Sequence, residues 1–105
     1  PYALNAVKEI LSENEFAQNS YFFLRLNANC SFPDEGVQFT NPHTDHSFKH
    51  VNLLIYLTDN GGKTFVEGEE HEPLEDDVIL FTGEHFFELP KKGRRIVIIA
   101  TLFVI

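Results

Sequence analysis

Apolar side chains recur at helical spacing only near the start of the chain. Leu4, Val7 and Leu11 are three or four residues apart, and the charged residues between them face the other side. This spacing predicts an amphipathic helix within residues 1–18 that fades near Asn14.

From residue 20 onward the chain has short apolar runs that are typical of β-strands. The expected strands are Ser20–Asn27, Val51–Thr58, Lys63–Glu67, Val78–Phe81 and Arg95–Val104. In the first of these, strict alternation places Phe23 and Arg25 on the same face as Tyr21. Val51–Thr58 is nearly all apolar, which predicts a strand that is covered on both faces.

Turn-forming residues separate these runs. Ser31–Pro42 is expected to be a loop, Asp59–Gly62 a tight turn, and Gly68–Pro73 an acidic, solvated connector. Many short strands separated by turns predict an antiparallel sandwich or barrel rather than alternating βαβ units. We therefore expect a mainly β core over residues 20–105.

Composition and charge narrow the range of partners. Sixteen acidic and eight basic side chains give a net charge of −8, so the chain lacks the basic surface that nucleic-acid backbones require. No apolar run reaches the roughly 18 residues of a membrane-spanning helix. The single cysteine, Cys30, cannot form an internal disulfide, which favours a reducing compartment. We expect one cytoplasmic domain over residues 1–105, with no nucleic-acid or membrane partner. Because position 1 is not Met, we also expect a trimmed or partial chain.

The main chemical signal is a histidine and an aspartate with one residue between them. On a strand, His43 and Asp45 point the same way. With one more imidazole they would form a 2-His-1-carboxylate triad, which holds three positions of an octahedral metal and leaves three open. Taken alone, His-x-Asp is weak evidence, since such polar pairs also occur on ordinary surfaces.

An ordered set of motifs follows this pair along the chain. The set comprises Tyr56-Leu57-Thr58-Asp59, Gly61-Gly62-Lys63-Thr64-Phe65, the run from Pro73 to Phe81, His85, and Gly93-Arg94-Arg95. In order and spacing, from about Asn41 to Phe103, the sequence resembles the 2-oxoglutarate- and Fe(II)-dependent dioxygenases, in particular the prolyl-4-hydroxylase-like branch. The resemblance implies a double-stranded β-helix (jelly roll) with an N-terminal helix.

The resemblance also implies roles for individual residues. His43, Asp45 and His85 would ligate iron, Arg95 would bind the distal carboxylate of 2-oxoglutarate, and the Tyr56 hydroxyl would assist at that carboxylate. Guanidinium suits this role because it can bind a carboxylate through two parallel hydrogen bonds. The implied activity is hydroxylation of a prolyl, peptidyl or small-molecule C–H bond with release of succinate and CO2. The implied cofactors are Fe(II), 2-oxoglutarate as cosubstrate and O2, with ascorbate in support.

Other residues compete for these roles. Arg94 and Arg95 face opposite sides of an extended chain, so only one reaches the site, and the Gly-x-Arg pattern favours Arg95. His46 and His50 are rival metal ligands, but we interpret His46 as a solvated or core-edge residue and His50 as the start of the next strand. His71 lies in an acidic run and is interpreted as a surface histidine.

The chain departs from the family pattern at two places. Asp76 stands where the family often has glycine, although aspartate also adopts turn conformations. The strand before the triad lacks the family's tyrosine, which leaves Asn27, Asn29 and Cys30 as candidates for the proximal cosubstrate contact. Two other functions stay open: a metal-binding jelly roll that serves only as a binding module, and a structural β-domain with incidental histidines. The sequence does not choose between a peptide and a small-molecule substrate.

Overall fold

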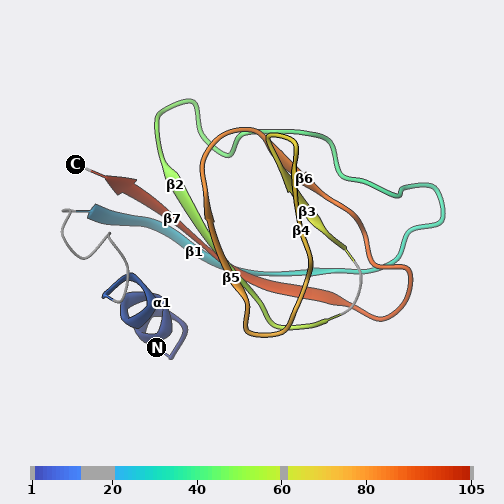
Figure 1. The fold of residues 1–105 in the computed structure, drawn as a ribbon, viewed down its shortest axis with the longest axis horizontal. Helices are drawn as coiled ribbons and strands as arrows, with labels where there is room; N and C mark the ends of the chain where they lie inside the picture. Colours follow the sequence, from blue (N-terminus) through green and yellow to red (C-terminus); the bar gives the residue numbers. More distant parts are fainter. Residues whose placement is uncertain (1, 13–20, 60–61, 105) are drawn as a thin grey trace.

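The structure, a computed structural model, describes residues 2–12, 21–59 and 62–104. Over these ranges it contains one helix and seven strands: α1 (Tyr2–Ser12), β1 (Tyr21–Ser31), β2 (Val51–Tyr56), β3 (Thr64–Val66), β4 (Glu69–His71), β5 (Val78–Phe81), β6 (His85–Phe87) and β7 (Arg95–Val104). The strands form two antiparallel sheets, ordered β1-β7-β2-β5 and β4-β3-β6 (Figure 1). The expectation of a mainly β, antiparallel fold is confirmed.

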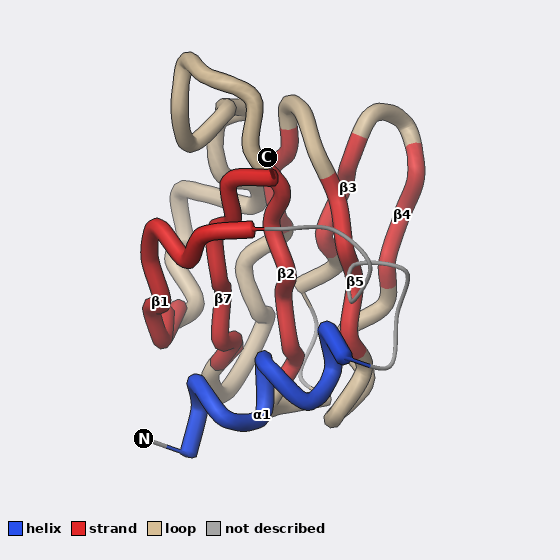
Figure 2. The backbone as a smooth tube through the Cα atoms, turned by 90° about the vertical axis from the view of Figure 1, so that its left-hand side faces the viewer, coloured by secondary structure: helices blue, strands red, loops and turns tan. Residues whose placement is uncertain are grey.

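Helix α1 covers the outer face of the four-stranded sheet. Its Val7 and Leu11 are fully buried and pack against the sheet residues Leu53 and Leu102. Figure 1 shows the helix on the opposite side of this sheet from β3, β4 and β6, and Figure 2 shows it lying across the strands. The predicted helix is confirmed over Tyr2–Ser12, and the rest of its predicted range lies outside the described residues.

Strand β2 separates two apolar cores because its alternate side chains face opposite sides. Leu53 and Ile55 belong to the core beneath α1, whereas Leu54 and Tyr56 belong to a second core on the inner face of the same sheet. The prediction of a strand covered on both faces is therefore confirmed, although the strand ends at Tyr56 rather than Thr58.

Strand β1 contains a β-bulge that breaks the expected alternation. Phe23 pairs with Leu102 of β7 and Arg25 pairs with Thr101, so Leu24 is an extra residue on β1. A single extra residue moves the side chains that follow it to the other face. Phe23 packs against the core beneath α1 while Arg25 lines a cavity between the sheets. The prediction that these two residues share a face is wrong.

Three segments are more regular than the sequence predicted. Strand β1 continues to Ser31 because its pairing with β7 extends that far. The acidic connector Gly68–Pro73 contains β4, and β6 follows the short turn after β5. Strand β4 is entirely polar and β6 has only two apolar residues, so neither carries a periodic apolar pattern, and their pairing with β3 defines them. The acidic side chains of β4 are nonetheless solvated, as predicted, and Lys63 pairs with Glu70.

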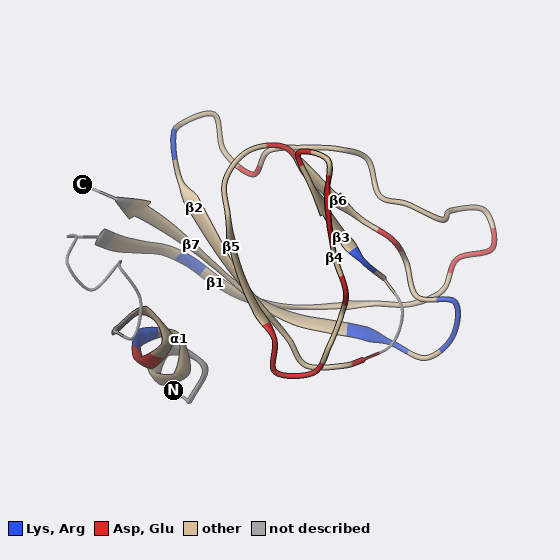
Figure 3. Cartoon of the chain, in the orientation of Figure 1, with Lys and Arg blue, Asp and Glu red and all other residues tan. Residues whose placement is uncertain are grey.

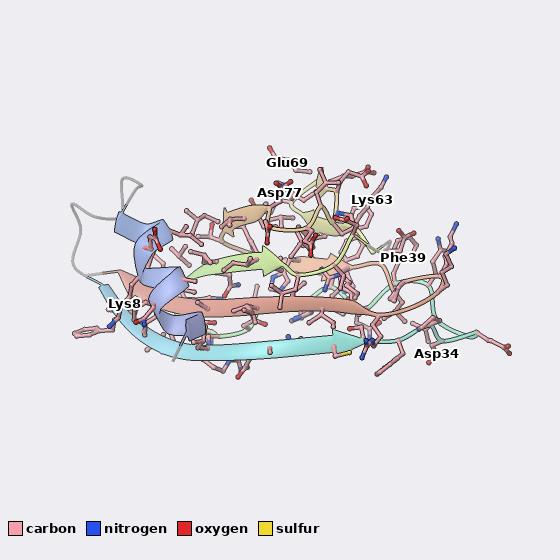
Figure 4. All side chains as sticks on the ribbon, turned by 90° about the horizontal axis from the view of Figure 1, so that it is seen from below. Lys8, Asp34, Phe39, Lys63, Glu69 and Asp77 are labelled. Atoms are coloured by element: carbon pink, nitrogen blue, oxygen red, sulfur yellow. The ribbon has the colours of Figure 1, made fainter. Side chains whose placement is uncertain are left out.

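Seen from below, α1 lies in front of the strands of the four-stranded sheet (Figure 4). The labelled Lys63 and Glu69 lie on the side away from β1, and Lys8 of α1 lies far from the loop that carries Asp34 and Phe39. Within the described ranges, no helix has the length and apolar character needed to cross a membrane.

Candidate active site

Three side chains with metal-binding atoms converge between the sheets. The ligand atoms of His43, Asp45 and His85 all lie within 4.8 Å of one another. The Nε2 atoms of His43 and His85 are 3.3 and 3.7 Å from the two carboxylate oxygens of Asp45. Backbone pairing enforces this approach, because His43 and His85 exchange N–H to carbonyl hydrogen bonds of 3.0 and 2.9 Å. Among the described residues this is the one group of three such side chains.

Both imidazoles are held in the tautomer that metal binding requires. The Nδ1 atom of His43 is 2.9 Å from the Asn41 carbonyl oxygen, and that of His85 is 3.2 Å from the Gly83 carbonyl oxygen. Because a carbonyl oxygen only accepts, each Nδ1 carries a proton, and the lone pair of the neutral ring is then on Nε2, which faces Asp45. Burial lowers the pKa of His85, which also favours its neutral form.

A buried hydrogen-bond chain orients the carboxylate of Asp45. The Asn52 Nδ2 donates to Asp45 Oδ2 over 3.1 Å, and the Thr101 hydroxyl donates to Asn52 Oδ1 over 3.2 Å. Asn52 and Thr101 are opposite each other in the β2–β7 pairing and are buried. Sequence reasoning missed both residues. The signal that could have found them is a single polar residue inside each of two otherwise apolar strands.

Arg95 lies within the same cavity and is only 2% exposed. Its Nε donates to the Gly62 carbonyl oxygen over 2.9 Å, its Nη2 donates to Thr64 Oγ1 over 2.8 Å, and its guanidinium carbon lies 4.2 Å from the centre of the Phe87 ring. Burial lowers the pKa of Arg95, but guanidinium stays protonated in proteins. No acidic side chain of the described residues pairs with it. A buried cation without a counter-ion is costly, so this part of the cavity is suited to an anion.

Tyr56 contacts this region through Thr64 and through Arg95, whose guanidinium carbon lies 5.7 Å from the centre of the Tyr56 ring. Its hydroxyl donates to Thr64 Oγ1 over 2.6 Å, so Thr64 accepts hydrogen bonds from both Tyr56 and Arg95. Burial raises the pKa of Tyr56, and its side chain does not line the cavity. Sequence reasoning assigned Thr64 only to the start of a core strand, because nothing in the chain pattern shows that β2 and β7 face it.

A cavity of about 70 Å3 connects the three metal-binding residues with Arg95. Its lining residues are Arg25, Asn29, His43, Asp45, Leu54, Thr64, His85, Phe87, Arg95, Val97 and Ile99. Of the three candidates for the proximal contact, only Asn29 lines the cavity, and Cys30 is exposed. A larger open hollow between residues 33–38 and 89–91 contains none of the metal-binding residues.

The rival residues lie elsewhere. Arg94 is exposed, and His46 stacks on the Phe48 ring with 4.8 Å between ring centres. His50 is buried just before β2, with its Nδ1 2.8 Å from the Phe48 carbonyl oxygen. His71 lies on β4 and is partly exposed. None of these histidines joins the group of three.

Two details of the turns agree with the sequence analysis. Asp76 has φ 70°, so an aspartate does adopt the left-handed conformation where the family often has glycine. Gly62 has φ 112°, and a Cβ there would lie 2.5 Å from the Glu88 carbonyl oxygen and 2.7 Å from Arg95 Cδ. Gly62 therefore allows the guanidinium stem to pack against the backbone. Gly61 lies outside the described residues.

The donor set fits a divalent transition metal. The imidazoles of His43 and His85 and the carboxylate of Asp45 converge at the cavity, so a metal held there would have three protein ligands and would keep other positions open. This combination is the one that proteins use for non-haem Fe(II).

Two solved structures share this fold. One is the viral collagen prolyl hydroxylase vCPH from Paramecium Bursaria Chlorella virus-1 in complex with 2-oxoglutarate, with a TM-score of 0.71 and 16% identity over 94% of this chain and 69% of that one. The other is an oxidoreductase of the 2OG-Fe(II) oxygenase family from Burkholderia pseudomallei, with a TM-score of 0.67 and 14% identity over 93% of this chain and 55% of that one. No protein-family model and no curated protein matches the sequence. At these identities the likeness establishes the fold.

Proposed function

We propose that this chain is an Fe(II)- and 2-oxoglutarate-dependent dioxygenase. The observation that carries the proposal is a single cavity that holds both the His43, Asp45 and His85 group and the buried Arg95. A keto-acid group can chelate a metal that has open positions, and a second carboxylate on the same molecule needs a fixed cation. 2-Oxoglutarate has both groups. The two fold neighbours support the same reaction class.

We also propose the jelly-roll topology and the prolyl-4-hydroxylase-like branch. In support, the strand order of both sheets is non-sequential, and the bridge between His43 and His85 adds a further segment beside β6 in the smaller sheet. The substrate would be a prolyl, peptidyl or small-molecule C–H bond, and the products would include succinate and CO2. A cytoplasmic location stays a prediction from the single cysteine.

The three metal-binding residues and Arg95 have distinct tasks in this proposal. Asp45 and the two Nε2 atoms would hold the metal, and the Asn41 and Gly83 carbonyl groups keep the imidazoles in the required tautomer. Arg95 would orient the distal carboxylate of the cosubstrate, with its guanidinium fixed by Thr64. When bound, Fe(II) supplies the activation of dioxygen for oxidation of the substrate.

The test measures metal binding, cosubstrate binding and turnover separately. Protein supplied with Fe(II), 2-oxoglutarate and ascorbate is expected to release succinate. Asp45→Ala is expected to lose metal binding but keep its far-UV circular dichroism spectrum, whereas Arg95→Gln is expected to keep the metal and lose 2-oxoglutarate binding. His71→Ala is the matched control, because His71 lies outside the cavity and should affect neither. Metal binding without succinate release would favour a binding module, and the absence of both activities would exclude the enzyme.

A further inference from the structure

Strand β1 turns a polar face toward the cavity. Beyond the bulge at Leu24, Arg25 and Asn29 line the cavity, while Leu26 packs against the core beneath α1. Side chains between two packed sheets are normally apolar, since they form the core. Arg25 and Asn29 are exposed on the edge strand, so the cavity is bordered here by polar side chains that a ligand entering from solvent can reach.

The strand register places two arginines far apart on this face. In the strand register, Arg25 of β1 lies opposite Thr101 of β7, and Thr101 lies opposite Asn52 of β2. Asn52 donates a hydrogen bond to Asp45. Arg95 lies at the other end of β7, and the extended chain from Arg95 to Thr101 spans about 20 Å. Figure 3 shows the basic segment of β1 and the basic start of β7 at separate places along the sheet. Arg25 therefore lies on the metal-binding side of the cavity, away from Arg95.

Arg25 is available to bind an anion. Its Nε donates to the Asn27 side-chain oxygen over 3.1 Å when that amide is oriented to satisfy both of its groups. Arg25 is exposed, and no acidic side chain of the described residues pairs with it. The chain has a net charge of −8, yet Arg25 and Arg95 both line this one cavity. One cation is placed for the cosubstrate, which leaves the other for a second molecule.

We propose that Arg25 binds a carboxylate of the substrate that is oxidised, at a subsite separate from the one for 2-oxoglutarate. This inference rests on the proposed function. Guanidinium presents parallel N–H donors that match the two oxygens of a carboxylate. A singly charged carboxylate is favoured over a phosphate dianion because one guanidinium faces this end of the cavity and the protein's net negative charge repels the dianion more strongly. The substrate is therefore an acid, either a small molecule or a peptide.

The test compares the binding of acids with the binding of their amides. The protein is loaded with 2-oxoglutarate and with Zn(II), which is a redox-silent metal. The probes are N-acetyl-amino acids as free acids and as primary amides, and their binding is measured by isothermal titration calorimetry. The amides of N-acetyl-aspartate and N-acetyl-glutamate carry a carboxylate only in the side chain, so they separate side-chain recognition from recognition of a chain end. We expect acids to bind at least about tenfold more tightly than matched amides.

Variants connect this preference to Arg25. Arg25→Gln is expected to abolish the preference and leave 2-oxoglutarate affinity unchanged, and Arg25→Lys is expected to retain part of it. Lys92→Gln removes the same charge from an exposed turn and should keep the preference. Circular dichroism verifies that each variant is folded.

The alternative outcomes are distinct. Equal binding of acids and amides, no binding of acids, tighter binding of N-acetyl-phosphoserine amide, or a preference that survives in Arg25→Gln would each overturn the subsite. Weaker 2-oxoglutarate binding by Arg25→Gln would also contradict the proposed substrate subsite, because Arg25 would then contribute to the binding of 2-oxoglutarate. A wild-type protein that fails to bind 2-oxoglutarate in the preliminary titration would instead remove the proposed function itself.

Discussion

At the scale of single residues, the candidate site depends on polar side chains that the apolar strands carry inward. Asn52 illustrates this, since it uses its amide nitrogen on Asp45 and its amide oxygen on the Thr101 hydroxyl. Groups beyond the metal ligands often set ligand orientation and change metal affinity by about 10–100-fold when they are removed. The orientation of the Asp45 carboxylate therefore depends on β2 and β7 as well as on the segment between β1 and β2 that carries Asp45.

Replacing Asn52 by alanine is expected to weaken metal binding by about tenfold or more. The substitution removes the donor to Asp45 Oδ2 and leaves the buried Thr101 hydroxyl without its acceptor. Titration with Co(II), followed by absorbance, measures the effect. Asn5→Ala on the exposed face of α1 is the matched control and should bind as the wild type does. Equal affinities for the two variants would show that Asp45 needs no such support.

His85 is expected to make the stability of the metal-free protein dependent on pH. Burial lowers its pKa below the ordinary 6.5. Below pH 6.5 the unfolded chain therefore binds a proton that the folded protein does not, and the free energy of unfolding falls as pH falls from 6.5 toward the lowered pKa. The slope for one fully linked proton is about 1.4 kcal/mol per pH unit. Urea unfolding at pH 7.5, 6.5 and 5.5 measures it, and His85→Gln should have a shallower slope; identical slopes would refute the assignment.

The sequence could predict residues whose chemical type is distinctive, but not residues whose role depends on a neighbouring strand. The resemblance to a known enzyme family implies a common site for His43, Asp45, His85 and Arg95, and the structure places all four around one cavity. Thr64 is different because an isolated threonine carries no signal. Its contact with Arg95 arises only when β3 and β7 face each other across the two sheets.

At the scale of elements, local irregularities decide which side chains reach the cavity. The bulge at Leu24 places Arg25 on the inner face, whereas strict alternation predicted that it shares a face with Phe23. A bulge is defined by a mismatch between two paired strands, so β1 alone cannot reveal it. The paired strands β2, β5 and β7 were predictable because their apolar runs are long enough to carry a pattern.

The turn before β3 is expected to tolerate no side chain at Gly62. Gly62→Ala would combine a left-handed backbone with a clash against the Glu88 carbonyl group and the Arg95 stem. Gly68→Ala is a matched control, because Gly68 has φ 88° but no atom lies within 4 Å of the place that a Cβ would occupy. Backbone strain alone costs about 1–2 kcal/mol. We expect Gly62→Ala to lower the free energy of unfolding by more than Gly68→Ala, and to weaken 2-oxoglutarate binding, which Gly68→Ala should not. Equal urea midpoints for the two variants would contradict this prediction.

At the scale of the whole molecule, one sheet serves two separate purposes. Its outer face packs under α1 through residues such as Leu53 and Leu102, whereas its inner face carries Asn52, Ile99 and Arg95 toward the cavity. Because adjacent residues of a strand face opposite sides, the ligand-binding residues alternate with those that pack under α1, and they share the inner face with a second apolar core that includes Leu54. The outer positions therefore serve only packing, whereas the inner positions divide between packing and the candidate site.

This separation predicts that a core substitution beneath the helix lowers stability without changing ligand binding. Leu11 is fully buried against the outer face, and Leu11→Ala is expected to lower the free energy of unfolding by about 2–5 kcal/mol. Ile99→Ala removes a comparable side chain from the inner face, where it lines the cavity. It should also destabilise the protein, but in addition it should change 2-oxoglutarate affinity. Urea unfolding and calorimetric titration of both variants measure the two effects. If Leu11→Ala alters 2-oxoglutarate affinity as much as Ile99→Ala does, the helix is coupled to the site through the sheet, and the two faces do not act independently.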